Sequence, residues 1–268
     1  MNRPDTILLD VGGTAIKCSD GRSVPSCSGG EREEIIAALR EAVGPTEGLR
    51  KLGVAIPGPF DYGQGTFLMK HKFAAVYGES FRTLAGIPDS VTIKYHHDVN
   101  AALQGAQRML GLMKDNAALV TLGTGLGFSY AVKGIIQYAK NGSPARGLWD
   151  MQMLDGRILE DRISARGISA TYARLSGING LTPKEIADLA HQGDANAIET
   201  YRSTGAILGG ALRVILGDMT LKVLLVGGGI AESLDLINAP LEQALDNVRI
   251  IRVPEGAVFK GLSSLFLK

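Results

Sequence analysis

Residues 6–19 read TILLDVGGTAIKCS, and residues 117–132 read AALVTLGTGLGFSYAV. In both stretches a short apolar run ends at a Gly-Thr turn, after which a strand pattern resumes. Each stretch therefore predicts a β-hairpin with a glycine-rich tip. The two tips lie about 110 residues apart, close to the length of one domain, so we expect two similar domains.

A glycine-rich hairpin tip can hold phosphate, because residues without Cβ let backbone N–H groups converge on one anion. Thr14 and Thr124 add hydroxyl donors at the two tips. Either tip alone could equally be a tight turn, whereas two tips that follow buried strands favour phosphate binding. Asp10 ends the first strand beside its loop, where an unpaired carboxylate would be costly unless hydrogen bonds or a cation met it. Mg²⁺, held through water, is a natural partner.

Two common nucleotide-binding motifs do not fit these loops. Gly123, Gly125 and Gly127 have the wrong spacing for a dinucleotide fingerprint, and a strand pattern follows them where that motif opens a helix. The chain also contains no GxxxxGK[ST] string. The sequence therefore predicts a hairpin cradle for phosphate.

Composition points to a small-molecule ligand. The 268 residues are 45% hydrophobic and carry 28 basic and 27 acidic side chains, so charge gives no reason to expect nucleic acid or a membrane as partner. Only two cysteines occur, and the first residues lack the apolar region of a signal peptide. We expect a cytoplasmic protein without a membrane span.

The spacing of the two hairpins places the domain boundary near residue 115, which gives an N-terminal domain 1–115 and a C-terminal domain 116–268. We expect the last helix to pack back on the first domain. Further strands are predicted at 52–56, 90–95, 222–226 and 248–253. Helices are predicted at 31–43, 100–112, 167–175, 183–191, 195–216, from 231 or 233 onward, and at 257–267.

Five strings, DVGGTAIK, GVAIPGPFD, HDVNAAL, TLGTGLGF and VGGGIAES, occur in the order of the ROK family of sugar kinases. The chain resembles this family, a branch of the actin, Hsp70 and hexokinase superfamily, over nearly its whole length. The resemblance implies an α/β fold of two ribonuclease-H-like domains with a nucleotide cleft between them. It further implies ATP and Mg²⁺ as cofactors, a sugar or polyol as substrate, and a homodimer.

The resemblance also assigns roles to residues. Nucleotide contacts fall on three segments: Asp10, Gly12, Gly13, Thr14 and Lys17; Gly123, Thr124, Gly125 and Gly127; and Gly227, Gly228 and Gly229 beside the adenosine. Asp98, in HDVNAAL, matches the catalytic base that accepts the proton of the attacking hydroxyl. The alternative is that Asp98 is the N-cap of the helix that follows.

The acceptor side departs from the family. Family members commonly carry Glu-x-Gly-His, a zinc loop rich in Cys and His, and Gly-Cys-x-Glu, whereas residues 147–168 read GLWDMQMLDGRILEDRISARGI. This stretch has neither Cys nor His, so no zinc site is expected. Gly147 and Asp150 stand where the family has Glu and His, while Glu160 matches the later Glu.

Candidate sugar contacts are therefore His71, Lys72, Asn100, Asp150 and Glu160. His71 and Lys72 could instead form a solvated loop, and Asp150 could simply be exposed. Trp149 could stack on a sugar but is more simply a packing residue. His96 and His97 are neighbours on a strand and should point to opposite faces, so they do not serve one site together.

Two other functions compete with a kinase. The altered acceptor side is compatible with a non-catalytic regulatory protein that binds a sugar or nucleotide. A repressor of this kind would carry a helix-turn-helix before the first strand, where only five residues stand. An ATPase machine of the Hsp70 or actin type is disfavoured by the length of the chain.

Overall fold

The computed structural model describes residues 5–267, which form two compact units. The first unit holds the chain up to Gly111, the short segment Tyr138–Pro144 and the chain from Pro254 onward. The second holds Leu112–Gln137 and Ala145–Val253. The chain thus leaves the first unit twice and returns to it twice. The predicted single boundary near residue 115 does not include these two returns.

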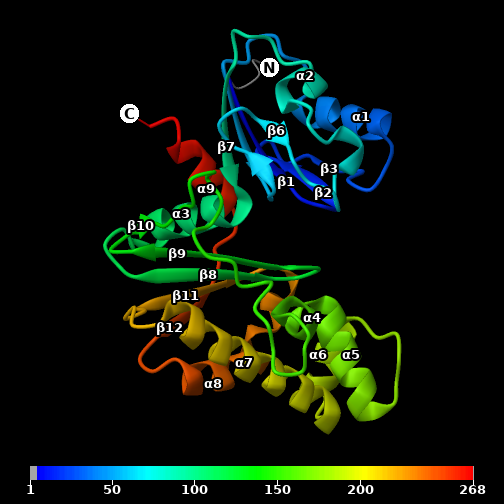
Figure 1. The fold of residues 1–268 in the computed structure, drawn as a ribbon, viewed down its shortest axis with the longest axis vertical. Helices are drawn as coiled ribbons and strands as arrows, with labels where there is room; N and C mark the ends of the chain where they lie inside the picture. Colours follow the sequence, from blue (N-terminus) through cyan, green and yellow to red (C-terminus); the bar gives the residue numbers. More distant parts are fainter. Residues whose placement is uncertain (1–4, 268) are drawn as a thin grey trace. The chain divides into compact units, whose positions relative to one another are not determined.

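The first unit is built on a five-stranded sheet in the order β3-β2-β1-β4-β7 (Figure 1). β1 (Thr6–Val11), β2 (Ala15–Cys18) and β3 (Ser23–Pro25) are antiparallel, whereas β4 (Lys51–Ile56) and β7 (Thr92–His97) continue the sheet parallel to β1. A small hairpin of β5 (Phe60–Asp61) and β6 (Thr66–Phe67) follows β4.

The second unit repeats this arrangement in the order β10-β9-β8-β11-β12. β8 (Ala117–Leu122), β9 (Leu126–Val132) and β10 (Ile135–Ile136) are antiparallel, and β11 (Val223–Gly227) and β12 (Arg249–Arg252) are parallel to β8. Both glycine-rich stretches therefore form the expected hairpins, and each opens a sheet of the same topology.

Helices cover both faces of the first sheet because successive strand residues point in opposite directions. Ile7 and Leu9 share one buried cluster with Leu39 of α1 (Arg32–Val43). Leu8, between them, belongs to a separate cluster with Ala101 and Leu262. The remaining short helices of this unit are η1 (Ala74–Val76) and α2 (Phe81–Ala85).

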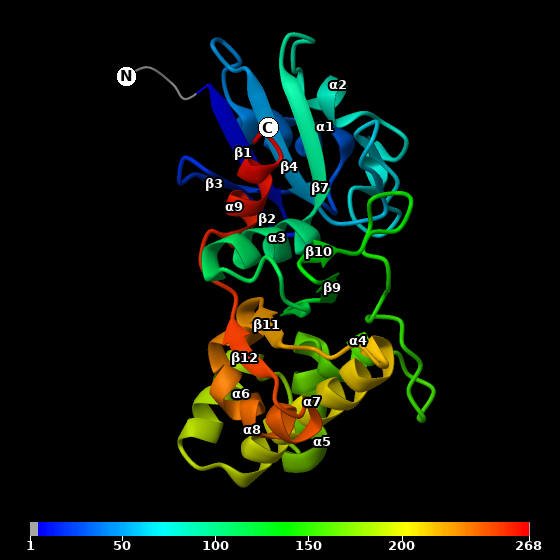
Figure 2. The ribbon, with the colours of Figure 1, turned by 90° about the vertical axis from the view of Figure 1, so that its left-hand side faces the viewer.

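α3 (Asp98–Leu110) and α9 (Ala257–Ser264) lie side by side against the sheet (Figure 2). Two glycines permit this close approach. A Cβ on Gly105 would lie 1.7 Å from the Ala257 carbonyl oxygen, and one on Gly261 would lie 2.0 Å from that of Ala101. Any larger residue would force the helices apart, and α3 carries Asp98 at its first position.

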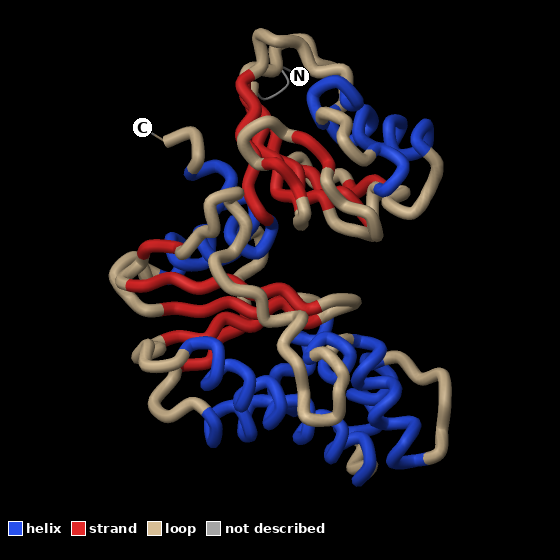
Figure 3. Tube along the Cα trace, viewed as in Figure 1, coloured by secondary structure: helices blue, strands red, loops and turns tan. Residues whose placement is uncertain are grey.

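The second unit is mostly helical beyond its sheet (Figure 3). Its core joins strand residues such as Leu224 to Tyr172 and Leu208 on the helices. Two helix starts have side-chain caps, with Thr182 accepting from the Glu185 N–H and Asp194 from the Ala197 N–H. The helices are α4 (Leu159–Ile163), α5 (Ala165–Ser176), α6 (Pro183–His191), α7 (Ala195–Leu216), η2 (Gly229–Ser233) and α8 (Leu234–Ala244).

Within the described range 5–267, none of the helices combines the length and the apolar character that crossing a lipid bilayer requires.

Candidate active site

Asp10 and Asp98 meet at one edge of the first sheet. β1, β4 and β7 run parallel, so their carboxyl ends share an edge, and Asp10 is in register with Ala55, which is in register with His96. Asp98 follows two residues after His96. The two carboxylates predicted to bind metal and to act as base therefore belong to one site.

Asp98 is the first residue of α3, and His97 is its N-cap, so the alternative that Asp98 caps this helix is wrong. β7 extends to His97 and leads directly into the helix, two residues earlier than the sequence pattern predicted. The Asp98 carboxylate accepts the Val99 N–H at 2.7 Å and lies 2.7 Å from His97 Nδ1. His97 Nδ1 and the Asp98 carboxylate are thus close enough for an ion pair, but their geometry is not that of a hydrogen bond.

The environments of the two carboxyl groups drive their pKa values apart. Burial raises the pKa of Asp10 to about 6, assisted by the charge of Asp98 and opposed by Lys17. For Asp98, burial acts in the same direction, but the His97 ring, the Val99 N–H and Lys72 together outweigh it and lower the pKa below its usual value. Asp98 is thus ionised at neutral pH, while Asp10 is poised to meet a cation.

The first hairpin tip is a tight loop beside Asp10. The Gly12 N–H donates to the Ala15 carbonyl at 2.9 Å, and a Cβ on Gly12 would lie 3.0 Å from that oxygen. The Ser28 hydroxyl donates to the Gly13 carbonyl at 2.5 Å, which ties the tip to the following loop. Thr14 and Lys17 are exposed, so both are available to a ligand.

The side chain of Lys72 lies over this hairpin tip, although the sequence analysis predicted it to contact the sugar. A Cβ on Gly13 would lie 3.1 Å from Lys72 Cε and 3.2 Å from its Nζ. The next residue, Phe73, is fully buried and its N–H donates to the Ser28 carbonyl at 2.6 Å. His71, by contrast, is exposed.

The second hairpin tip, in the other unit, is held by Glu160. The Glu160 carboxylate accepts the Leu126 N–H at 2.9 Å, and a Cβ on Gly125 would lie 3.0 Å from the same oxygen. Its other oxygen lies 3.0 Å from Arg166. Gly123 accepts from the Ala165 N–H at the start of α5, while Thr124 is exposed. Glu160, predicted to contact sugar, therefore supports the second hairpin tip in this structure.

The three glycines after β11 adjoin this second tip. Gly227 pairs with Thr121 across the parallel strands β11 and β8. Gly228 has a φ of 83°, and a Cβ there would lie 2.2 Å from the Leu122 carbonyl oxygen. Gly229 has open space where a Cβ would stand. The three glycines predicted to lie beside adenosine are thus next to the strand that leads into the Gly123–Gly127 loop.

The other acceptor-side candidates belong to different units. Asn100 is fully buried and donates to the Gly142 carbonyl at 3.2 Å, so its side chain holds the segment Tyr138–Pro144 in this conformation. Asp150 is exposed beside Gly147. Trp149 is 50% exposed and is not the packing residue that its size suggested.

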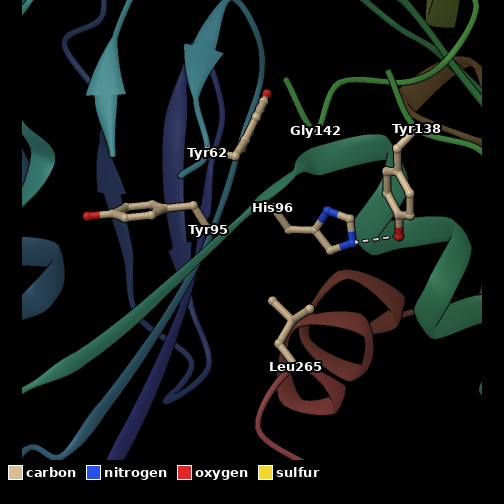
Figure 4. A pocket seen from close by; sticks show the side chains of 6 residues that line it. All are labelled: Tyr62, Tyr95, His96, Tyr138, Gly142 and Leu265. Carbon is tan, nitrogen blue, oxygen red and sulfur yellow. Dashed lines mark hydrogen bonds between the residues drawn. The ribbon is translucent and has the colours of Figure 1, made fainter. Parts of the chain in front are cut away.

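A hollow of about 240 Å³ in the first unit was not foreseen from the sequence. Its lining residues are Tyr62, Tyr95, His96, Tyr138, Gly142 and Leu265 (Figure 4). The Tyr138 hydroxyl is directed at His96 Nε2, 3.5 Å away, and Gln104 lies 3.2 Å from the same nitrogen. Burial lowers the pKa of His96 to about 4, so this imidazole is neutral at physiological pH.

The acidic pair fits a magnesium ion better than a zinc ion. Among residues 5–267 no three His, Cys, Asp or Glu side chains are grouped to hold a metal on their own. Mg²⁺ is commonly held by one or two carboxylates together with water and substrate phosphate. Asp10, whose half-buried carboxyl group has a raised pKa beside the negative charge of Asp98, offers such a partial site.

Comparison with known proteins gives a consistent picture. The family model described as "ROK family" matches residues 7–255. A ROK glucokinase from Streptomyces griseus, solved with glucose and AMPPNP, is 22% identical with a TM-score of 0.75, over 97% of this chain and 98% of that one. A ROK hexokinase from Thermus thermophilus is 20% identical with a TM-score of 0.69, over 96% of both chains.

A ROK transcriptional regulator, described as a homologue of the E. coli MLC protein, is 15% identical with a TM-score of 0.70 and is matched over 81% of its length by 99% of this chain. No curated protein sequence matches. At these identities the structural matches establish the fold, and the predicted two-domain α/β fold is confirmed.

Proposed function

The chain belongs to the ROK family, and on that basis we propose that it transfers the γ-phosphoryl group of ATP to a hydroxyl group of a sugar or polyol. The resemblance carried by the five sequence strings is confirmed by the family match. Kinases and regulators share this fold, so the proposal rests on the site rather than on the fold.

The observation that carries the proposal is the pairing of Asp10 with Asp98. Two carboxyl groups at one sheet edge, with pKa values moved in opposite directions, suit two different roles. Asp98, ionised and about one-third exposed, suits a base that accepts a proton from substrate. Asp10, beside a glycine-rich loop, suits a ligand of Mg²⁺ that binds it through water.

The proposed reaction transfers one proton to the enzyme and one phosphoryl group to the substrate. Asp98 accepts the proton of the attacking hydroxyl, the hydroxyl oxygen forms a bond to the γ-phosphorus, and the bond from that phosphorus to the β,γ-bridging oxygen breaks. The electron pair of the broken bond stays with ADP. Bound Mg²⁺ would supply positive charge near the phosphates. Gly12, Gly13, Thr14 and Lys17 in one unit and Gly123, Thr124, Gly125 and Gly127 in the other are the proposed phosphate contacts.

The proposed acceptor contacts are the residues predicted from the sequence, His71, Lys72, Asn100, Asp150 and Glu160, together with Asp98. The Glu160 carboxylate contacts the Leu126 N–H and Arg166, and the Asn100 side chain donates to the Gly142 carbonyl. To bind sugar, each side chain must also contact the substrate or give up one of these partners. The homodimer and the cytoplasmic location likewise stay predictions.

The test is ADP release from ATP and Mg²⁺ across a panel of hexoses, amino sugars and polyols, with an Asp98→Asn variant in parallel. We expect sugar-dependent ADP release in the wild type and its loss in the variant. The rival is a regulatory protein that binds sugar without catalysis, favoured by the buried position of Asn100 and the exposure of Asp150. Sugar binding without any phosphorylated product would support that rival.

A further inference from the structure

We propose that Lys72 is a catalytic residue that contacts the γ-phosphoryl group during transfer, a role that rests on the proposed kinase function. The sequence analysis grouped Lys72 with the candidate sugar contacts, whereas in the first unit its side chain lies over the first hairpin tip. Its side chain extends across Gly13, so that Cε and Nζ lie within 3.1–3.2 Å of where a Cβ would stand. A cation there lies at the tip of the loop that holds phosphate.

The chain around Lys72 is built to keep it on this loop. Phe73, directly after it, is fully buried among Phe67 and its neighbours and has a left-handed φ of 53°. The Phe73 N–H donates to the Ser28 carbonyl, and the Ser28 hydroxyl donates to the Gly13 carbonyl. Lys72 and Gly13 are therefore linked through Ser28 by two short hydrogen bonds, which fix the lysine backbone relative to the loop.

Lys72 also acts on the proposed base. Its charge contributes to the low pKa of Asp98, while the charge that acts on Asp10 is that of Lys17. Lys17 lies on β2 after the loop, whereas the Lys72 side chain lies over the loop tip at Gly13. Negative charge develops on the transferring phosphoryl group, and a cation near both the proposed base and the hairpin tip can stabilise that charge.

The chemistry distinguishes this role from a sugar contact. An ammonium group that meets the γ-phosphoryl group contributes to binding of a nucleoside triphosphate and not to binding of the diphosphate. A sugar contact contributes to neither. The variants Lys72→Met and Lys72→Arg remove and retain the charge, and Lys70→Met removes an exposed lysine two residues away that lies over the Tyr77 ring.

The experiment measures the dissociation constants of AMPPNP and ADP, each with Mg²⁺, by calorimetry on all four proteins, after thermal melting has checked that they fold. For Lys72→Met we expect AMPPNP to bind about tenfold more weakly and ADP within about twofold of wild type. Lys72→Arg and Lys70→Met should both stay within about threefold for either nucleotide.

Equal weakening of AMPPNP and ADP, or no weakening of either, in a folded Lys72→Met protein would overturn the role. So would failure of the wild type to bind AMPPNP. The readout separates this inference from the proposed function, because wild type that binds AMPPNP but phosphorylates no sugar refutes the kinase and still reports on Lys72. Where turnover is found, Lys72→Met should lower kcat more than it raises the KM for sugar, and should shift the acidic limb of the pH profile to higher pH.

Discussion

The charge of Asp98 helps to raise the pKa of Asp10 to about 6, although the two residues are separated by most of the first unit in sequence. They meet because β1 and β7 are parallel strands of one sheet that end at the same edge. An apo site with this arrangement holds one carboxylate that resists ionisation. The relation has a measurable consequence for stability.

Asp10→Asn should stabilise the nucleotide-free protein at neutral pH. A folded pKa raised above the unfolded value of 3.8 contributes stability that is present below pH 3.8 and lost as the pH rises through 6. Removal of the charge should therefore raise the free energy of unfolding by about 1–3 kcal/mol at pH 7.5, and by less at pH 5. Thermal melts at the two pH values check this, with Asp89→Asn as an exposed control. A variant less stable than wild type at pH 7.5 would contradict the burial of Asp10.

Gly228→Ala should disrupt the second unit. The left-handed backbone costs about 1–2 kcal/mol for alanine, and its Cβ meets the Leu122 carbonyl at 2.2 Å, which must move. We expect a lower melting temperature together with weaker ADP binding. Gly229→Ala, at the adjacent open position, is the matched control and should melt as the wild type does. Equal melting of the two variants would argue against the close approach of Gly228 to Leu122.

Gly105→Ala should separate α3 from α9. Its Cβ would overlap the Ala257 carbonyl, and overpacking that forces the backbone to shift costs about 1–3 kcal/mol. Gly210→Ala, on the exposed side of α7 with no neighbour within 4 Å, should instead stabilise by about 0.5–1 kcal/mol. Chemical denaturation of both variants gives the comparison. An unchanged midpoint for Gly105→Ala would show that α9 does not pack as described.

Glu160→Ala tests whether this carboxylate supports the second loop. The Leu126 N–H would lose its partner, and we expect a loss of about 1–2 kcal/mol in stability and weaker nucleotide binding. Asp161→Ala removes the neighbouring carboxylate, which pairs only with the exposed Arg166 at 2.6 Å among the contacts described for it, and should be nearly neutral. A rise in the KM for sugar with unchanged nucleotide binding would show that Glu160 is a sugar contact instead.

Local sequence patterns were sufficient for much of the fold. Both glycine-rich hairpins form, and α6 and α7 begin and end where the sequence pattern predicted. Several short elements were not predicted, because β3, β5, β6 and α4 each span five residues or fewer and show too little of a hydrophobic period. The first turn after β11 is a 3₁₀ helix, so α8 begins at Leu234 and not at Ala231 or Ser233.

The contacts within the candidate site were harder to predict from the sequence, because they join residues that are far apart along the chain. The Lys72 side chain lies over Gly13, and Asn100 donates to the Gly142 carbonyl, although both pairs are far apart in sequence. No local pattern indicates either contact. Trp149 is exposed although its size favours burial. Only the order of the glycine and aspartate motifs pointed to the phosphate side, and nothing comparable marked the acceptor side.

The most direct test of the account follows the γ-phosphoryl group itself. ATP labelled at the γ-position is incubated with Mg²⁺ and the sugar panel, and label is measured in sugar phosphate for wild type and Asp98→Asn. We expect label on at least one sugar with wild type, and transfer at least about 100-fold slower with Asp98→Asn although AMPPNP still binds. Label on no sugar with wild type, or equal transfer by the two proteins, would contradict it.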